Sequence, residues 1–189
     1  SSDAGLNLVA AVRTAACPDS RGRGVLVVLN DEIQAAREVT KTSVARLQTF
    51  RTPDFGILGH VDGESVRYYR RSERAHAPGT PFDIRCLTAL PRVDVAYAHA
   101  DADGTAVRAF RAAGARGIVM AGLAPGMVPP AEADALAEAA AAGLAVVMST
   151  RAGSGIVPMT TRLRQRGILS ADNLTPQKAR ILLALALTV

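Results

Sequence analysis

The 189-residue chain has no tryptophan, three tyrosines, four phenylalanines and two cysteines. Because aromatic residues make up only 4% of the chain, its core has to be built from aliphatic side chains and alanine. Cys17 and Cys86 are too few for a disulfide framework and show no metal-ligand spacing. No apolar run approaches the roughly 18 residues of a membrane-spanning helix, so we expect no membrane partner.

Lysine is almost absent as well. Of 22 basic residues only Lys41 and Lys178 are lysines. Arginine therefore supplies the ordinary positive charge, and Lys41 stands between two hydroxyl residues, Thr40 and Thr42. An ammonium group can be desolvated until it loses its proton, whereas a guanidinium cannot. Two interpretations follow from the residues alone: Lys41 is a catalytic group, or it is a solvated surface lysine like most others.

The net charge of +5 and the pI near 9.9 would suit a nucleic-acid-binding protein. The arginines are scattered, however, aromatic stacking residues are scarce, and no nucleic-acid-binding motif occurs. The densest group comprises Arg67, Arg70, Arg71 and Arg74. We interpret this group as a solvated or subunit-facing surface and expect no nucleic-acid partner, with RNA binding as the minor alternative.

The first residues predict a helix. Ser2 or Asp3 can cap the amino end of residues 1–17. The helix-spaced apolar stripe comprises Leu6, Val9, Ala10 and Val12. A helix that leads into a buried strand is typical of an α/β domain.

An unbroken apolar run, Val25–Leu29, predicts a strand covered on both faces, as in parallel sheets. Asn30-Asp31 follows as a turn pair at the carboxyl end, where open α/β sheets place their sites. Residues 32–38 fit either a helix or an extended segment. Thr42 or Ser43 is then expected to cap a short helix that reaches about Gln48.

A change of pattern divides the chain. Val61 and Val66 flank Asp62-Gly63, which predicts a β-hairpin. Residues 71–91 have few apolar side chains and three prolines, which predicts a linker. We therefore expect one domain over residues 1–70 and another over residues 92–189.

Residues 92–189 predict a smaller parallel unit of the order βαβαβα. The predicted strands are 93–98, 117–121, 144–149 and 168–169, and the predicted helices are 105–113, 131–142 and one opening at Thr175-Pro176. Gly114 and Gly143 stand where helices end, and Pro176 suits a first helical position. The fold class is therefore α/β.

Several segments resemble bacterial L-asparaginases of the asparaginase/glutaminase family. They are GVLVVLND (24–31), REVTKTS (37–43), TPDFGILGHVDG (52–63), TPFDI (80–84), GARGIVMAGL (114–123) and NLTPQKARILLALALT (173–188). The resemblance covers nearly the whole chain in order. It implies that residues 1–70 are the C-terminal part of a larger parallel-sheet N-terminal domain, and that residues 92–189 are the smaller C-terminal domain. It also favours an extended course for residues 32–38.

The resemblance implies hydrolysis of L-asparagine to L-aspartate and ammonia by a threonine nucleophile. Such a hydroxyl needs a proton acceptor and oxyanion donors. Lys41 stands where the family keeps the catalytic lysine of a Thr-Lys-Asp cluster. The family's TGGTI-type and HGTDT-type segments, which carry the threonines and the aspartate, do not occur in these 189 residues. We therefore expect the chain to begin partway through the family's N-terminal domain and to be inactive alone.

Two positions depart from the family pattern. Gly126-Met127 occupies a loop where the family often has an asparagine or serine that reaches a neighbouring subunit's site. A thioether is a poor hydrogen-bond partner, so we expect Met127 to pack between subunits. Residues 157–166 contain three arginines and no acid, where many members have a glutamate. These changes predict an altered substrate preference or weak activity.

The histidines, His60, His76 and His99, are far apart and have no partners at ligand spacing. We expect them to be exposed or simply hydrogen-bonded, and we expect no metal and no cofactor. Asp101 and Asp103 follow a predicted strand and are candidates for lining a cleft, but we expect Asp103 to cap the next helix.

Two functions remain open. The first is an asparaginase-type amidohydrolase acting on an amino-acid amide, for which the resemblance implies a homotetramer or dimer with sites between subunits. The second is a catalytically inactive α/β homologue acting in assembly or small-molecule binding. A nucleotide-binding domain ranks last, because no glycine fingerprint occurs. The choice between asparagine and glutamine stays open, and a cytoplasmic location is favoured over a periplasmic or secreted one.

Overall fold

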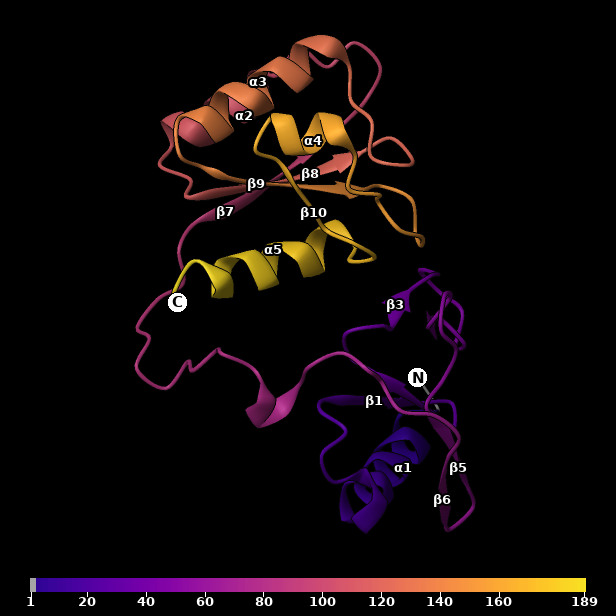
Figure 1. Cartoon of the computed structure of the whole chain (residues 1–189). Helices are drawn as coiled ribbons and strands as arrows, with labels where there is room; N and C mark the ends of the chain where they lie inside the picture. The colour runs from indigo at the N-terminus through magenta and orange to yellow at the C-terminus, as the bar shows by residue number, and fades with distance from the viewer. Residues whose placement is uncertain (1–2) are drawn as a thin grey trace. The chain divides into compact units, whose positions relative to one another are not determined.

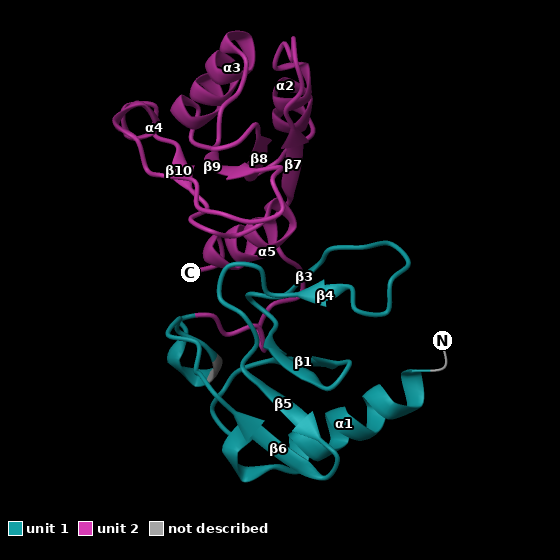
Figure 2. Ribbon diagram, turned by 90° about the vertical axis from the view of Figure 1, so that its right-hand side faces the viewer, with its two compact units in different colours: residues 1–81 teal, residues 82–189 magenta. Residues whose placement is uncertain are grey.

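The computed structural model describes residues 3–189 and divides the chain into two compact units, residues 1–81 and 82–189 (Figure 2). The boundary falls between Pro81 and Phe82, inside the segment 71–91 that the sequence predicts as a linker. In the described part of the chain, no helix combines the length and the apolar composition that a membrane crossing requires.

In residues 1–81, helix α1 covers one face of a four-stranded antiparallel sheet of order β1-β2-β5-β6 (Figure 1). The elements are α1 Ala4–Ala16, η1 Pro18–Ser20, β1 Leu26–Leu29, β2 Glu32–Ala35, β5 Gly59–Asp62, β6 Ser65–Tyr68 and η2 Ala77–Gly79. β3 Thr40–Lys41 and β4 Phe50–Arg51 form a separate two-stranded sheet. Ala10 of α1 packs with Ile33 and Val61 in a small core.

The pairing of β1 corrects the predicted parallel strand. β1 runs antiparallel to β2, with Leu29 opposite Glu32. The reason is the turn pair: Asn30 and Asp31 have φ values of 50° and 61°, as in a two-residue type I′ hairpin turn. Such a short turn can join only antiparallel strands. β1 is therefore a half-buried edge strand, and the extended course expected after it is confirmed for Glu32–Ala35.

Helix α1 is confirmed, but its predicted apolar stripe is not the side that is buried. Ala10 and Thr14 are buried, and the Thr14 hydroxyl donates to the Ala10 carbonyl at 2.8 Å. The other predicted stripe residues, Leu6, Val9 and Val12, are exposed. Asp3 is the N-cap, although its carboxylate accepts from the Asn7 side chain rather than from the backbone. Ser2 lies outside the described residues.

The predicted hairpin near Asp62 is confirmed as β5 and β6, with the turn one residue later, at Gly63-Glu64. Gly59 is required where the two strands meet. An added Cβ atom there would lie 2.0 Å from the carbonyl oxygen of Arg67.

In residues 82–189, a parallel sheet of order β10-β9-β8-β7 lies between helices on both faces (Figure 1). The strands are β7 Val93–Tyr97, β8 Gly117–Gly122, β9 Ala145–Thr150 and β10 Leu169–Ser170. α2 Thr105–Ala112, α3 Pro130–Ala141 and α4 Thr161–Gln165 cover one face, and α5 Pro176–Ala186 covers the other. The predicted α/β class is confirmed.

Successive residues of β8 serve two different cores. Ile118 and Met120 pack in the cluster under α2, α3 and α4, whereas Val119 packs in the cluster on the α5 side. Gly114 and Gly143 follow α2 and α3 with φ values of 82° and 88°, as predicted for helix ends. Helix α4 was not predicted from the sequence.

Candidate functional site

Lys41 lies on a two-stranded hairpin in residues 1–81. Thr40 pairs with Arg51, and Lys41 pairs with Phe50. The side chain of Lys41 is exposed. Among the residues that the structure describes, none forms a hydrogen bond or an ion pair with its ammonium group. The hairpin therefore presents the amine at the surface of this chain.

Hydroxyl groups close the loop between the two short strands. Thr42 Oγ1 donates to the Thr49 carbonyl at 2.9 Å, and Thr49 Oγ1 accepts from the backbone N–H of Ser43 at 3.0 Å. Thr49 Oγ1 also donates to the Ser43 carbonyl. The predicted helix from Thr42 or Ser43 to Gln48 is wrong, because these groups bond across the loop instead of starting a helix.

A buried amide joins this hairpin to the sheet. Gln34 of β2 is fully buried, and its Nε2 donates to the Phe50 carbonyl at 2.9 Å. The hydroxyl of Thr52 donates to Gln34 Oε1 at 2.8 Å. Gln34 thus holds the strand that pairs with Lys41. No sequence motif marks Gln34, although its alternation with Ile33 and Ala35 places it on the sheet face opposite to theirs.

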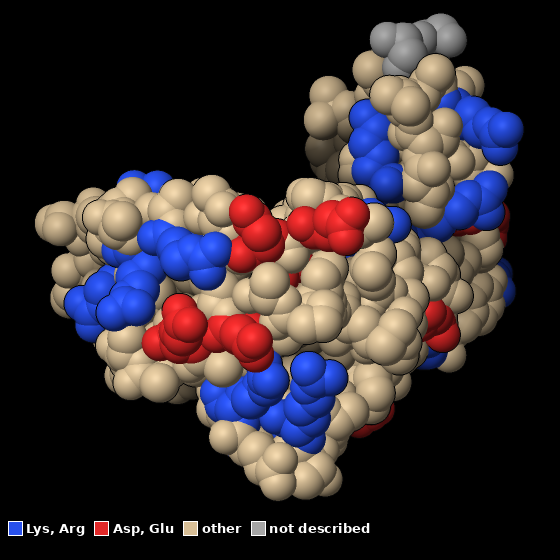
Figure 3. All heavy atoms as spheres, turned by 90° about the horizontal axis from the view of Figure 1, so that it is seen from above, with Lys and Arg blue, Asp and Glu red and all other residues tan. Residues whose placement is uncertain are grey.

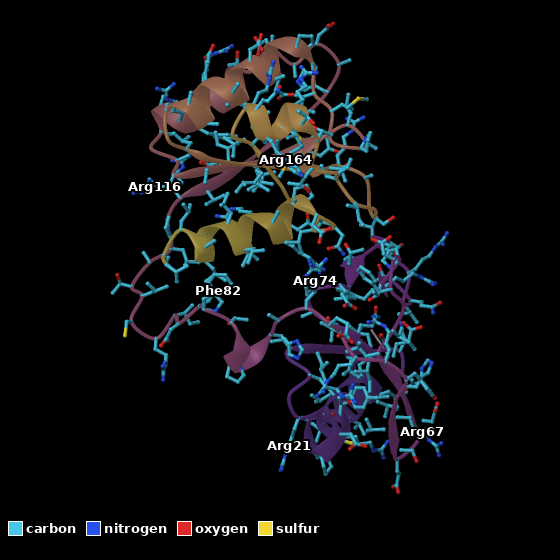
Figure 4. All side chains as sticks on the ribbon, in the orientation of Figure 1. Arg21, Arg67, Arg74, Phe82, Arg116 and Arg164 are labelled. Atoms are coloured by element: carbon cyan, nitrogen blue, oxygen red, sulfur yellow. The ribbon has the colours of Figure 1, made fainter. Side chains whose placement is uncertain are left out.

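The densest arginine group of the sequence does not form one patch. Arg70 Nη2 pairs with Glu38 Oε2 at 2.5 Å, and Arg70 also donates to the carbonyls of Ile57 and Gly56. Arg67 and Arg74 lie well apart on residues 1–81 (Figure 4). On the face drawn in Figure 3, small groups of basic side chains lie beside small groups of acidic ones.

The second predicted site, Gly126-Met127, follows β8 in residues 82–189. Leu123 and Met127 form an isolated antiparallel bridge, which makes 123–127 a tight loop. Gly126 has a φ of 109°, and an added Cβ atom would lie 2.6 Å from Val157 Cγ1. Met127 is exposed beside a cavity of about 370 Å³. Its apolar lining includes Met127, Val128, Leu136, Met148 and Leu163.

The acid-free segment 157–166 forms another wall of this cavity. Arg162 lines the cavity, whereas Arg164 is exposed on α4 (Figure 4). Arg166 donates to the Ala133 carbonyl at 2.7 Å and to Asp134 Oδ1 at 3.2 Å. The segment therefore contributes positive charge and helix packing. By the family resemblance, many members have a glutamate in this segment, and this chain has none.

Each histidine has a ring nitrogen within hydrogen-bond distance of a backbone carbonyl. The pairs are His60 with Asp31, His76 with Arg74 and Gly22, and His99 with Ala100. Within residues 3–189, no group of three or more His, Cys, Asp or Glu side chains could hold a metal ion. Asp103 accepts from the backbone N–H of Thr105 at 2.9 Å, and this bond lowers the pKa of Asp103. The N-cap residue of α2 is Gly104, however, so the prediction that Asp103 caps this helix is wrong by one position.

The acidic side chain of Glu132 is buried. Glu132, in the first turn of α3, is only 2% exposed, and its Oε2 has no hydrogen-bond partner in the described chain. Burial raises the pKa of Glu132; the nearby charge of His99 opposes this shift and that of Asp103 adds to it. Glu132 stands in an alanine-rich helix, and no sequence motif marks it.

Residues 1–81 thus present an exposed lysine on a hairpin whose loop is held by hydroxyl hydrogen bonds. Residues 82–189 present a loop beside an apolar cavity. Two family models match the chain: "Asparaginase, N-terminal" over residues 1–74, and "Glutaminase/Asparaginase C-terminal domain" over residues 92–189. The chain belongs to the asparaginase/glutaminase family. The two matched segments leave residues 75–91 between them.

Individual relatives agree with this assignment. A probable periplasmic L-asparaginase of Haemophilus influenzae is 42% identical over 100% of this chain and 54% of its own length. L-asparaginase 2 of Escherichia coli is 40% identical over 100% of this chain and 55% of its own length. The crystal structure of a probable cytoplasmic L-asparaginase from Campylobacter jejuni superposes with a TM-score of 0.95 at 39% identity, over 98% of this chain and 61% of that one. The chain thus spans about half the length of the curated relatives it matches.

Proposed function

We propose that this chain is the lysine-bearing part of an asparaginase-type amidohydrolase that converts L-asparagine to L-aspartate and ammonia. Family membership supports the reaction class. The observation that carries the proposal is Lys41, the only lysine besides Lys178 of α5, presented on a hairpin that Gln34 anchors. The backbone of the hairpin is anchored, and the amine of Lys41 is exposed. This arrangement suits a proton-transfer role in a site that other residues complete.

In the proposed reaction a threonine hydroxyl attacks the amide carbon and forms a tetrahedral intermediate. This intermediate expels ammonia and leaves an acyl-enzyme ester, which water hydrolyses to release L-aspartate and restore the threonine. Lys41 takes up the hydroxyl proton through a cluster with a second threonine and an aspartate, and the same proton passes to the departing nitrogen, which leaves as ammonia. Those three groups belong to the part of the family chain that this sequence does not span.

The loop at Gly126-Met127 is proposed to face a neighbouring subunit's site in a homotetramer or dimer. Met127 is exposed on a loop that Gly126 holds close to Val157. Its thioether offers the substrate's amino group only a weak hydrogen-bond acceptor. We therefore expect weaker recognition of the amino group than a serine or asparagine would give.

The test uses the chain completed by co-expression with the part of the Haemophilus influenzae relative that the match leaves uncovered. Lys41→Arg should lower the kcat of ammonia release by about 10²–10⁴-fold, because the guanidinium cannot give up its proton. Lys178→Arg is the matched control and should leave kcat within about twofold. Near-normal turnover in the Lys41→Arg enzyme would remove Lys41 from the mechanism.

A second candidate, an inactive homologue that binds small molecules, is favoured by Met127 and by the acid-free segment 157–166. It predicts that the completed protein binds L-aspartate, measured by calorimetry, yet releases no ammonia from L-asparagine. Ammonia release that depends on Lys41 would exclude this candidate.

A further inference from the structure

The cavity of about 370 Å³ beside the Met127 loop lies wholly within residues 82–189. Its lining comes from α3 and α4, which lie on the same face of the parallel sheet (Figure 1), from β9 and from the loop that follows β8. Small-molecule sites in proteins typically have volumes of about 300–1,000 Å³. The reaction proposed above uses the loop at the rim and leaves the interior of the cavity unassigned.

The lining of the cavity changes from apolar to charged between its floor and its mouth. Leu136 and Met148 form part of the floor and are 0% and 2% exposed. Met127 and Arg162 are exposed, which places them at the mouth. This order matches an elongated ligand with an apolar tail and a polar head, because the floor removes the tail from water while the head stays near solvent.

The positive charge at the mouth has no partner within the chain. Among the residues that the structure describes, none forms a hydrogen bond or an ion pair with the side chain of Arg162. Arg166, the other basic residue of the lining, already donates to the Ala133 carbonyl and to Asp134 Oδ1. The guanidinium of Arg162 is therefore available to a ligand, and guanidinium groups bind carboxylates through two parallel hydrogen bonds.

The mouth of the cavity offers nothing to a cationic group. No acidic side chain of residues 3–189 lines the cavity, and residues 157–166 contain three arginines and no acid. The hydroxyl of Thr160 accepts from the N–H of Leu163 at 3.2 Å, so its hydrogen can still be donated to an anion. An ammonium group next to the ligand's carboxylate would meet Arg162 without a compensating charge. The cavity therefore suits a carboxylate that carries no amino group.

The volume of the cavity indicates the length of the tail. A water-sized group takes up about 30 Å³, so the cavity accommodates roughly twelve such groups. A carboxylic acid of about eight carbons fills most of this space. Octanoate is a molecule of this kind.

We propose that this cavity binds a free, unbranched carboxylic acid of medium chain length. Its tail lies between α3, α4 and β9, and its carboxylate pairs with Arg162. Binding of this acid requires neither Lys41 nor a reaction. Octanoate binding by an assembly that releases no ammonia would contradict the proposed function alone, and ammonia release without octanoate binding would contradict the present proposal alone.

The test titrates the 189-residue chain with sodium octanoate and follows methyl resonances by NMR. Resonances of Met148 and Leu163 should shift and saturate with a Kd between about 10 µM and 1 mM, the range open to a ligand of this size. Leu183 packs on the α5 side of the sheet, so its resonance should not shift and serves as the internal reference. Shifts that do not saturate below about 10 mM would overturn the proposal.

The chain length of the acid tests whether the tail is buried. Hexanoate should bind about tenfold more weakly than octanoate, because its shorter tail buries fewer methylene groups. Equal affinities for the two acids would show that the tail lies outside the cavity and would overturn the proposal.

Two analogues of octanoate test the head group. Octanamide keeps the tail and lacks the charge, whereas 2-aminooctanoate keeps the carboxylate and adds an ammonium group. Each should bind at least about fivefold more weakly than octanoate. An affinity of either analogue equal to that of octanoate would contradict the proposal.

Two arginines on α4 provide a matched pair of variants. Arg162→Gln should weaken octanoate binding by at least about fivefold and leave octanamide binding within about twofold. Arg164→Gln removes the same charge from an exposed position outside the lining, so octanoate binding should stay within about twofold. Equal losses from the two substitutions would reduce the effect to general electrostatic attraction and overturn the site. A dimer of this chain that Arg162→Gln dissociates and octanoate leaves intact would identify an acid of a second copy as the partner of Arg162 and contradict the proposal.

Two alanines on α3 provide a matched pair for the tail. Ala133 is buried and lines the cavity, so Ala133→Leu should fill part of it and weaken octanoate and octanamide alike by at least about tenfold. Ala131→Leu adds the same bulk at an exposed position outside the lining and should change neither affinity by more than about twofold. The unshifted Leu183 resonance reports that each variant keeps its fold. Unchanged octanoate binding by a folded Ala133→Leu chain would overturn the proposal, and the chain-length comparison decides the same point without any substitution.

Discussion

At the residue scale, Glu132 shows how the fold creates a group with an altered protonation equilibrium. Its carboxyl is buried at the start of α3, and Oε2 lacks a hydrogen-bond partner in the described residues. Burial disfavours the charged form and raises the pKa of Glu132 in the folded state above its ordinary value. The favourable location at a helix N-terminus does not reverse this shift.

This raised pKa predicts a pH-dependent stability. The folded protein holds the proton more tightly than the unfolded chain, so Glu132 costs no stability below about pH 4.5, and stability falls as the pH rises through the folded-state pKa. Glu132→Gln should therefore raise the Tm at pH 8, and the gain should shrink toward zero near pH 4. Thermal unfolding measured from pH 4 to 8 checks this. Glu138→Gln, at an exposed position of the same helix, is the control. A Tm gain that is the same at every pH would contradict the assignment.

For single residues, the sequence indicates the chemistry of a side chain better than its burial or exposure. The scarcity of lysine drew attention to Lys41 without any structure. Its exposure was not predictable, because the surroundings of a side chain depend on elements distant in sequence. Gln34 and Glu132 were missed for the same reason: nothing local shows that these polar side chains are buried.

At the element scale, the Lys41 hairpin depends on one buried amide. Gln34→Leu should destabilise the protein by about 1–3 kcal/mol, because the Phe50 carbonyl and the Thr52 hydroxyl lose their buried partner. Exchange at the Thr42 amide, which donates to the Thr49 carbonyl at 2.8 Å, should become faster. Both quantities are measurable by denaturant unfolding and by hydrogen exchange.

Gln48 supplies the matched control for this prediction. It lies on the same hairpin and is exposed, with hydrogen bonds to Glu32 and Arg51. Gln48→Leu should change stability by less than about 0.5 kcal/mol. Equal effects of the two substitutions would show that burial of Gln34 does not hold the hairpin.

Elements were predictable where the local signal was complete. Apart from α4, the strands and helices of residues 92–189 follow from long apolar runs, helix-ending glycines and the proline at the start of α5. The direction of β1 was misjudged because its apolar run suits either kind of sheet. The deciding signal was the Asn30-Asp31 pair, which fits a two-residue hairpin. The buried side of α1 depends on what packs against it, which periodicity alone does not reveal.

At the scale of the whole molecule, the two units differ in how much core they hold. The cluster under α1 has three buried side chains, Ala10, Ile33 and Val61. Residues 82–189 contain two larger clusters on the two faces of the parallel sheet. A small core leaves little hydrophobic stabilisation against the conformational entropy of the chain.

This difference predicts two unfolding steps rather than one. In rising urea, amides of β5 should lose protection before amides of β8, and proteolysis should first cut within residues 1–81. Hydrogen exchange at intermediate urea separates the steps. Assembly of this chain with the uncovered part of the Haemophilus influenzae relative should move the first step to higher urea by mass action and leave the second step unchanged. A single transition for both sets of amides in the isolated chain would contradict the two-step prediction.

The central claim is that this chain supplies the lysine side of a divided amidohydrolase site. The most direct measurement is ammonia release from L-asparagine by three samples: this chain alone, the uncovered part of the Haemophilus influenzae relative alone, and the two co-expressed. The account predicts ammonia from the co-expressed pair only. Ammonia from this chain alone, or none from a pair shown by light scattering to be assembled, would contradict it.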